Sequence, residues 1–241
     1  GLALYRDEAP AGSIKVTVRR LLPDVDWAEL STALSERFGG DVPLHENGNY
    51  AVVIVAGEER EVLDILETRY YNMRIMSAGR RIEIFKEAGR PDEISKRFGF
   101  RELHGSHAIG HTRMATESAV TPAHSHPFTG GEDFCLVHNG SLSNPYMLRR
   151  KLEREGLRFE TDNDTEAACR YIQWKLDIGA TLEEALHEAF VELDGFYTFL
   201  MATHNQLTLV RDAFACKPVL NNCWSTHPTE NTPPPRETHS Q

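Results

Sequence analysis

Apolar and polar positions in the first part of the chain repeat with the periods of strands and helices. Ile14, Val16 and Val18 alternate with polar residues, which predicts a half-buried strand. Asp26 stands where it can cap a following helix. That helix would carry on one face the residues Trp27, Leu30, Leu34 and Phe38.

A hairpin and a second helix follow. The turn around Asn47-Gly48 separates Val42 and Leu44 from the apolar run 50–55, and Asn-Gly between two such runs is a strong hairpin signal. A helix with an apolar face at Val62, Leu63, Leu66 and Tyr70 comes next, then strands at 73–77 and 81–85. The order β-α-β-β-α-β, with one extra strand, predicts a ferredoxin-like unit that we assign to residues 14–100.

The second half of the chain has a different order of elements. Residues 2–5 are typical of the stub of a strand, residues 105–113 of a strand that runs into a loop, and residues 134–137 of a buried strand that ends in His138-Asn139-Gly140. Helices are predicted at 144–155, 164–177 and 181–193, and a strand hairpin at 196–203 and 206–211. The polar segment 221–241 contains Pro233-Pro234-Pro235 and has no hydrophobic period, so we expect a disordered tail.

Composition narrows the class of protein. A hydrophobic fraction of 40% and a charged fraction of 26% in 241 residues are those of a globular chain. The formal net charge of -10 argues against nucleic acid or an anionic membrane as the main partner. No apolar run approaches the ~20 residues of a membrane span, and no signal peptide is visible. Four cysteines without a CxxC pair are typical of reduced thiols in a cytoplasmic protein.

Three segments combine residues that can bind a zwitterionic substrate: 110–116 with Arg113, then His138-Asn139-Gly140, then 161–166 with Asp164. Taken singly, each has a structural reading, because an arginine at a strand end often forms a surface ion pair, Asn-Gly is often a turn, and Asn or Asp before a helix is often a cap. In this order they resemble the class II glutamine amidotransferases, together with the strand that ends in Arg211-Asp212. The resemblance runs from about Gly105 to Pro218.

The resemblance implies a fold and a set of boundaries. We expect an α+β protein with the αββα four-layer sandwich of N-terminal-nucleophile hydrolases and a ferredoxin-like βαββαβ insertion. Residues 1–13 would be the stub of the glutaminase domain, 14–100 the insertion, 101–220 the domain core, and 221–241 a tail unrelated to the family.

The resemblance also assigns roles to single residues. Arg113 would hold the α-carboxylate of glutamine through its guanidinium fork, and Asp164 would hold the α-ammonium. The Asn139 side chain and the Gly140 N–H would form the oxyanion hole. Met114 and Thr116 would line the glutamine pocket.

The family's nucleophile is an N-terminal cysteine, and this chain has Gly1 in its place. Cys135, Cys169, Cys216 and Cys223 lie in a strand, a helix, the end of the last strand and the tail, so none is expected to substitute. We therefore expect a fragment that binds glutamine without hydrolysing it. The family's Asn-Ala-Gln-Pro or Asn-Ala-His-Pro stretch is here His124-Ser125-His126-Pro127, which puts the usual asparagine contact in doubt.

The long stretch between Tyr5 and Gly105 is similar to that in stand-alone amidotransferase subunits of N-methylglutamate synthase and glutamate-synthase-like complexes. The resemblance thus implies a cytoplasmic hetero-oligomer in which glutamine is hydrolysed to glutamate and ammonia, and a partner synthase subunit or domain uses the ammonia. It implies no cofactor, no metal, no nucleic acid and no membrane.

Two alternatives stay open. Eleven histidines are present, and His124-x-His126 is a plausible ligand pair, so the chain could be a metal-dependent hydrolase. The missing nucleophile also fits a non-catalytic glutamine-binding or regulatory subunit.

Overall fold

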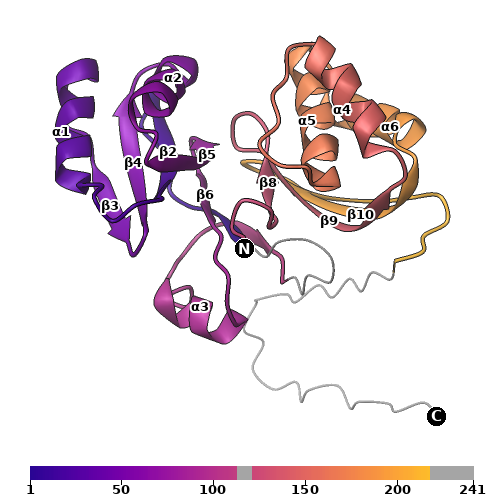
Figure 1. The fold of residues 1–241 in the computed structure, drawn as a ribbon, viewed down its shortest axis with the longest axis horizontal. Coiled ribbons are helices and arrows are strands. Elements are labelled where there is room, and N and C mark those ends of the chain that lie inside the picture. The colour runs from indigo at the N-terminus through magenta and orange to yellow at the C-terminus, as the bar shows by residue number, and fades with distance from the viewer. Residues whose placement is uncertain (113–120, 218–241) are drawn as a thin grey trace, which may run out of the picture.

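The computed structural model describes residues 1–112 and 121–217. Its strands are β1 (Leu2–Tyr5), β2 (Ser13–Arg20), β3 (Leu44–Asn47), β4 (Tyr50–Ala56), β5 (Met73–Gly79), β6 (Ile82–Phe85), β7 (His107–Gly110), β8 (Phe128–Thr129), β9 (Cys135–Leu142), β10 (Gly195–Ala202) and β11 (Leu207–Arg211). Its helices are α1 (Trp27–Phe38), α2 (Glu59–Arg69), α3 (Pro91–Arg97), α4 (Pro145–Arg154), α5 (Asp164–Asp177) and α6 (Leu182–Glu192). Figure 1 shows two groups of elements, with the N-terminus between them.

The first group consists of β2, α1, β3, β4, α2 and β5, and we call it the ferredoxin-like unit. Its sheet has the order β3-β4-β2-β5, and every neighbouring pair is antiparallel. The expected strand-helix-strand-strand-helix-strand order is therefore present. Asp26 caps α1 as predicted, since its side chain accepts the N–H groups of Ala28 and Glu29. Leu30 and Leu34 of α1 lie in an apolar core with the sheet.

The prediction of a half-buried strand at residues 14–18 was wrong, because β2 is buried on both faces. Lys15 and Thr17, which point away from the helices, are 4% and 0% exposed. The Lys15 ammonium forms an ion pair with Glu83 at 3.2 Å and donates to the Asp7 carbonyl at 2.7 Å. A lysine becomes buried here because a distant carboxylate pairs with it, which a local pattern does not reveal.

The second group consists of a sheet of order β11-β10-β9-β8 covered by α4, α5 and α6, and we call it the helix-covered sheet (Figure 1). Its core lies between helices and sheet and includes Leu136, Tyr171, Ile172 and Phe199. Strand β9 is longer than the strand predicted at 134–137, because it continues through His138, Asn139 and Gly140 to Leu142. Pairing with β10 over its whole length keeps these polar residues in the ladder.

A third sheet, of order β6-β1-β7, packs against the other face of the helix-covered sheet. Their shared core includes Tyr5, Ile84, Ile109, Val137 and also Tyr50 of the ferredoxin-like unit. The chain is thus a mixed α/β protein built on antiparallel sheets. The β6-β1-β7 sheet contacts both of the others, and each of those two carries helices on its far face. The Tyr5 hydroxyl joins the layers, because it donates to the carbonyl of Ala202 at 2.8 Å.

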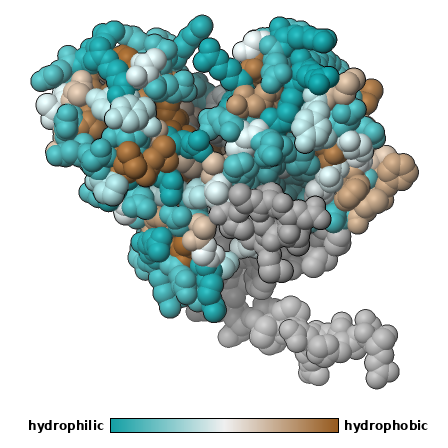
Figure 2. All heavy atoms as spheres, in the orientation of Figure 1, coloured by the Kyte–Doolittle hydropathy of each residue, from teal (hydrophilic) through white to brown (hydrophobic). Residues whose placement is uncertain are grey.

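The surface agrees with the charged composition. Figure 2 shows a face that is mostly hydrophilic, with hydrophobic residues in small, separate patches. None of the helices in residues 1–112 and 121–217 has the length and apolar character required to span a bilayer.

Candidate functional site

Gly140 is required by the packing of β9 against β10. Its φ of 147° is one that side chains with a Cβ rarely adopt. A Cβ at this position would lie 2.0 Å from the carbonyl oxygen of Phe196 on β10. The glycine of the His-Asn-Gly motif is therefore required for the close approach of β10 to β9, independently of any role of its N–H in binding.

Asp164 is the first residue of α5, and its carboxylate faces β9. The N–H of Leu142 donates to Asp164 Oδ2 at 3.0 Å. The helix is capped by Asn163, whose side chain accepts from the N–H of Thr165 at 2.9 Å. Because Asn163 satisfies the helix end, Asp164 is left to interact with β9 and with the space beside it.

The loop that leads into α5 is held by buried charged side chains. Glu166, 3% exposed, accepts from the N–H of Glu160, the N–H of Thr161 and the Thr161 hydroxyl at 2.6–2.8 Å. Arg149 of α4 donates to the carbonyls of Thr161 and Asn163. These bonds fix the loop on both sides of Asp164, so its carboxylate is preorganised.

Two histidines and one threonine form a buried hydrogen-bonded network behind Asp164. The backbone N–H of His138 donates to His126 Nδ1 at 3.4 Å, so the neutral His126 ring carries its proton on Nε2. That Nε2 lies 3.0 Å from Thr165 Oγ1, which lies 3.1 Å from His138 Nδ1. The threonine can thus accept from one ring and donate to the other.

His138 is strongly affected by this environment. Burial lowers its pKa from 6.5 to about 4, although the Asp164 carboxylate, 3.8 Å from Nδ1, acts in the opposite direction. Its Nε2 is buried and meets no hydrogen-bond partner within residues 1–112 and 121–217. At neutral pH the ring is therefore an uncharged spacer between β9 and α5.

A polar cavity of about 340 Å³ lies where β9 meets the start of α5. Its lining consists of His124, Gly140, Ser141, Leu142, Pro145, Asp162, Asn163 and Asp164. Asn139 is exposed, and its side chain has no hydrogen-bond partner among the residues that the structure describes. Side chains alternate along β9, so Asn139 belongs to the face of Val137, and Gly140 to the face of Leu142.

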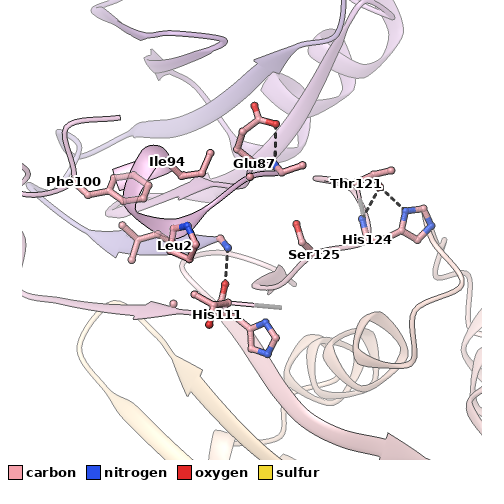
Figure 3. Close-up of a pocket in the computed structure, with 14 residues that line it drawn as sticks. Leu2, Glu87, Ile94, Phe100, His111, Thr121, His124 and Ser125 are labelled. Atoms are coloured by element: carbon pink, nitrogen blue, oxygen red, sulfur yellow. Dashed lines mark hydrogen bonds between the residues drawn. The ribbon is translucent and has the colours of Figure 1, made fainter. Parts of the chain in front are cut away.

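A second cavity, of about 380 Å³, adjoins the first at His124. Figure 3 shows Leu2, Ile94 and Phe100 on one side of it and Thr121, His124 and Ser125 on the other. Its lining also includes Gly1, Glu87 and His111, but neither Gly140 nor Asp164, which line the first cavity. The polar cavity is the better candidate for glutamine.

Neither buried thiol is a candidate nucleophile. Cys135 on β9 and Cys169 on α5 are both 0% exposed. Burial raises the pKa of each thiol to about 12, so neither forms a thiolate at neutral pH. Both are core residues, as the sequence predicted. Cys216, which follows β11, is exposed and free.

The structure brings together only part of the predicted glutamine site. Gly140 and Asp164 line the same cavity, whereas the side chain of Asn139 lies on the other face of β9 and does not line it. Arg113, Met114 and Thr116 lie outside the described residues, so their predicted contacts remain predictions. Among the residues that the structure describes, no group of three histidine, cysteine, aspartate or glutamate side chains is arranged to hold a metal ion.

Sequence reasoning overlooked the contacts of Thr165, His126 and the N–H of Leu142. Thr165 was only a letter of a motif and His126 only a possible metal ligand, and the bond between them joins positions 39 residues apart. The only signal was that hydroxyl and imidazole groups fall on segments predicted to be buried, where they require partners.

Comparisons with known proteins identify the family. The family model described as "Glutamine amidotransferase domain" matches residues 111–226, which extends into the segment expected to be an unrelated tail. The glutamine amidotransferase-like protein GlxB of Rhizobium meliloti (strain 1021) is 46% identical over 221 residues, 91% of this chain and 73% of GlxB. Glutamine--fructose-6-phosphate aminotransferase (isomerizing) of Thermococcus kodakarensis is 35% identical over 60% of this chain and 24% of its own.

A solved structure of the allosteric regulatory enzyme of purine biosynthesis matches 58% of this chain and 29% of its own, with 27% identity and a TM-score of 0.44. The match to GlxB covers most of both chains at high identity, and the matched family model includes Arg113, His138-Asn139-Gly140 and Asp164 from the three motif segments. The family resemblance read from these motifs is thereby confirmed. This chain belongs to the class II glutamine amidotransferases.

Proposed function

We propose that the polar cavity beside Asp164 binds glutamine and that the chain supplies the glutamine-binding part of a glutaminase site. The observation that supports this most directly is the bond from the Leu142 N–H to Asp164 Oδ2. It holds the carboxylate beside Gly140 in one cavity. The other oxygen, Oδ1, lies 3.4 Å from the Thr165 hydroxyl and would also accept from an α-ammonium. In this proposal Asn139 and Gly140 are the oxyanion hole, and Arg113, Met114 and Thr116 complete the pocket.

We also propose the setting in which this site works. The ammonia would pass to an acceptor on a partner synthase subunit, as in N-methylglutamate synthase or glutamate-synthase-like complexes, and the chain would be part of a cytoplasmic hetero-oligomer. The free thiols of Cys135, Cys169 and Cys216 fit a reducing compartment. The architecture we propose is the four-layer αββα sandwich with residues 14–100 as its insertion and 101–220 as its core.

Titration of glutamine tests the binding site. Asp164→Asn should weaken binding by about tenfold or more, which is ~1.4 kcal/mol, because an amide cannot pair with the ammonium. Asp162→Asn is the matched control: it removes the same charge at the same cavity, but among the described residues Asp162 pairs with His124 alone, at 3.5 Å, and its side chain is 82% exposed. Isothermal titration calorimetry of the two variants decides, and equal losses would place glutamine elsewhere.

The second part of the proposal is that the 241-residue polypeptide binds glutamine without hydrolysing it. The buried thiols support this, since attack on an amide requires an accessible thiolate with a base beside it. Ammonia release from glutamine by this polypeptide should equal the buffer background. Release that disappears in Cys216→Ser would contradict the proposal and identify Cys216 as a nucleophile.

A polypeptide that carries a cysteine-led segment ahead of Gly1 tests the two assigned substrate contacts. In it, Asn139→Ala should lower kcat by roughly a hundredfold, because its bond forms with the developing oxyanion. Arg113→Ala should mainly raise KM, because the α-carboxylate is bound in both the ground and transition states. An Asn139→Ala variant with altered KM alone would show that Asn139 is a structural residue of β9.

A further inference from the structure

A small cavity lies between the two groups of elements and shares no lining residue with the polar cavity of Asp164. It has a volume of about 40 Å³, whereas ~10–15 Å³ is enough for one water molecule. Strand β5 and Lys86, which follows β6, line one side of it, and β8 and α5 line the other. Figure 1 shows β5 and β6 facing β8 across the centre of the molecule.

Lys86 is the buried cation of this cavity. The residue is 6% exposed, and its backbone is fixed by Tyr50, whose hydroxyl donates to the Lys86 carbonyl and accepts from its N–H. Its ammonium lies 4.6 Å from the centre of the Phe128 ring. Within residues 1–112 and 121–217 it has no hydrogen bond and no carboxylate within ion-pair distance.

A buried ammonium without a counter-ion is unfavourable. Burial accordingly lowers the pKa of Lys86 to about 8, despite the partly opposing carboxylates of Glu160 and Glu166. At neutral pH most of the Lys86 side chains still carry a proton, so the cavity contains a positive charge that the fold does not neutralise by direct contact.

The other charged groups of the cavity pair among themselves. Arg74 lies 3.6 Å from Glu160, and Arg170 lies 3.9 Å from Glu166. The oxygens of Glu166 also accept the N–H groups of the preceding loop, so neither of them is free to turn to Lys86. Three cations and two carboxylates line the cavity, which leaves one positive charge, that of Lys86.

We propose that this cavity binds a small monovalent inorganic anion of the size of chloride, with the Lys86 ammonium as its principal partner. The charge, the volume and the unpartnered donor all fit such an ion, and the volume is too small for a whole carboxylic acid of metabolic size. The anion would connect Lys86 to α5, whose first residue is Asp164. It would therefore stabilise the contact between the two groups of elements, independently of whether the chain binds glutamine.

Thermal unfolding with chloride replaced by gluconate at constant ionic strength tests the proposal, since gluconate is too large for the cavity. The midpoint of the wild-type chain should rise with chloride in a saturable way. In gluconate, the Lys86→Met variant should unfold at a higher temperature than the wild-type chain, and its midpoint should not change with chloride. Lys151→Met is the control, because it removes an equally charged but half-exposed lysine that pairs with Glu192, and it should keep the response.

A wild-type midpoint that does not respond to chloride, or that responds equally in Lys86→Met, would overturn the proposal and leave water as the occupant. Crystals of the unmodified chain grown in bromide give a test that needs no variant. An anomalous peak within hydrogen-bonding distance of Lys86 Nζ supports the proposal. Bromide found only on the surface, an adventitious ion only, contradicts it.

Discussion

The helix-facing core of the ferredoxin-like unit and the start of α5 are built from different kinds of side chain. The first consists of aliphatic and aromatic residues. On the other face of β2, Lys15 pairs with Glu83, but the buried hydroxyl of Thr17 has no described partner. At the start of α5 the buried groups are imidazoles, carboxylates and hydroxyls that bond to one another. The comparison teaches that the first region is made for stability, whereas the second holds specific atoms in place beside the polar cavity.

The largest expected effect lies in the apolar region. Leu34→Ala removes a side chain that is 1% exposed and should lower the free energy of unfolding by about 2–5 kcal/mol. Urea unfolding measures this loss, with Leu21→Ala, 46% exposed in the same unit, as a control that should cost less than about 1 kcal/mol. If the regions are separate, glutamine affinity of the folded Leu34→Ala chain should not change. A weaker affinity would show that the ferredoxin-like unit also shapes the site.

The next prediction is a loss of stability in acid that arises from His138 at the start of α5 and not from the ferredoxin-like unit. The folded pKa of His138 is lowered to about 4 from 6.5, so the unfolded chain binds more protons between these values. The contribution of the uncharged His138 to the free energy of unfolding should be fully present above pH 6.5. It should fall by about 3 kcal/mol as the pH decreases to 4. In His138→Asn, which cannot titrate but can still bond to Thr165, this part of the acid dependence should disappear. His45→Asn, at an exposed histidine of the ferredoxin-like unit, should retain it.

The smallest expected effect gives the clearest test of the comparison. The same substitution, threonine to valine, should lower the free energy of unfolding at one site and leave it unchanged or raise it at the other. Thr165→Val leaves His126 Nε2 and His138 Nδ1 without their shared hydroxyl and should cost about 1–3 kcal/mol. Thr17→Val removes a buried hydroxyl that bonds to no described residue, so it should be neutral or stabilising. Equal losses in urea unfolding would mean that the network contributes nothing beyond packing.

Local sequence signals were sufficient for most elements. Asp26 and the period of α1, the Asn-Gly hairpin and the helices of the second half were each predicted from neighbours in the chain. The errors arose where distant residues decide. Lys15 is buried because Glu83, 68 positions away, pairs with it, and β9 extends through Asn139 because β10 lies beside it. No periodicity contains that information.

The candidate site, like the fold, was predicted only in part from local sequence. The motif segments predicted Gly140 and Asp164, and both residues line one cavity in the structure. The partners of these residues could not be predicted, because a bond such as that from the Leu142 N–H to Asp164 depends on how a strand and a helix meet. A sequence motif shows which residues form a site, but the contacts that hold those residues in place are seen only in the folded structure.

The ends of the ferredoxin-like unit lie side by side. Lys15 at its beginning is paired with Gly79 at its end, and the N–H of Ala9 donates to the carbonyl of Arg80 at 2.8 Å. The chain therefore leaves and re-enters the β6-β1-β7 sheet at one point. Such a unit can be exchanged for another, or for a short turn, without a new path for the remaining chain, and only the packing of Tyr50 and its neighbours against that sheet must be rebuilt. In evolutionary terms, a single junction of this kind lets the ferredoxin-like unit change while the path of the rest of the chain stays the same.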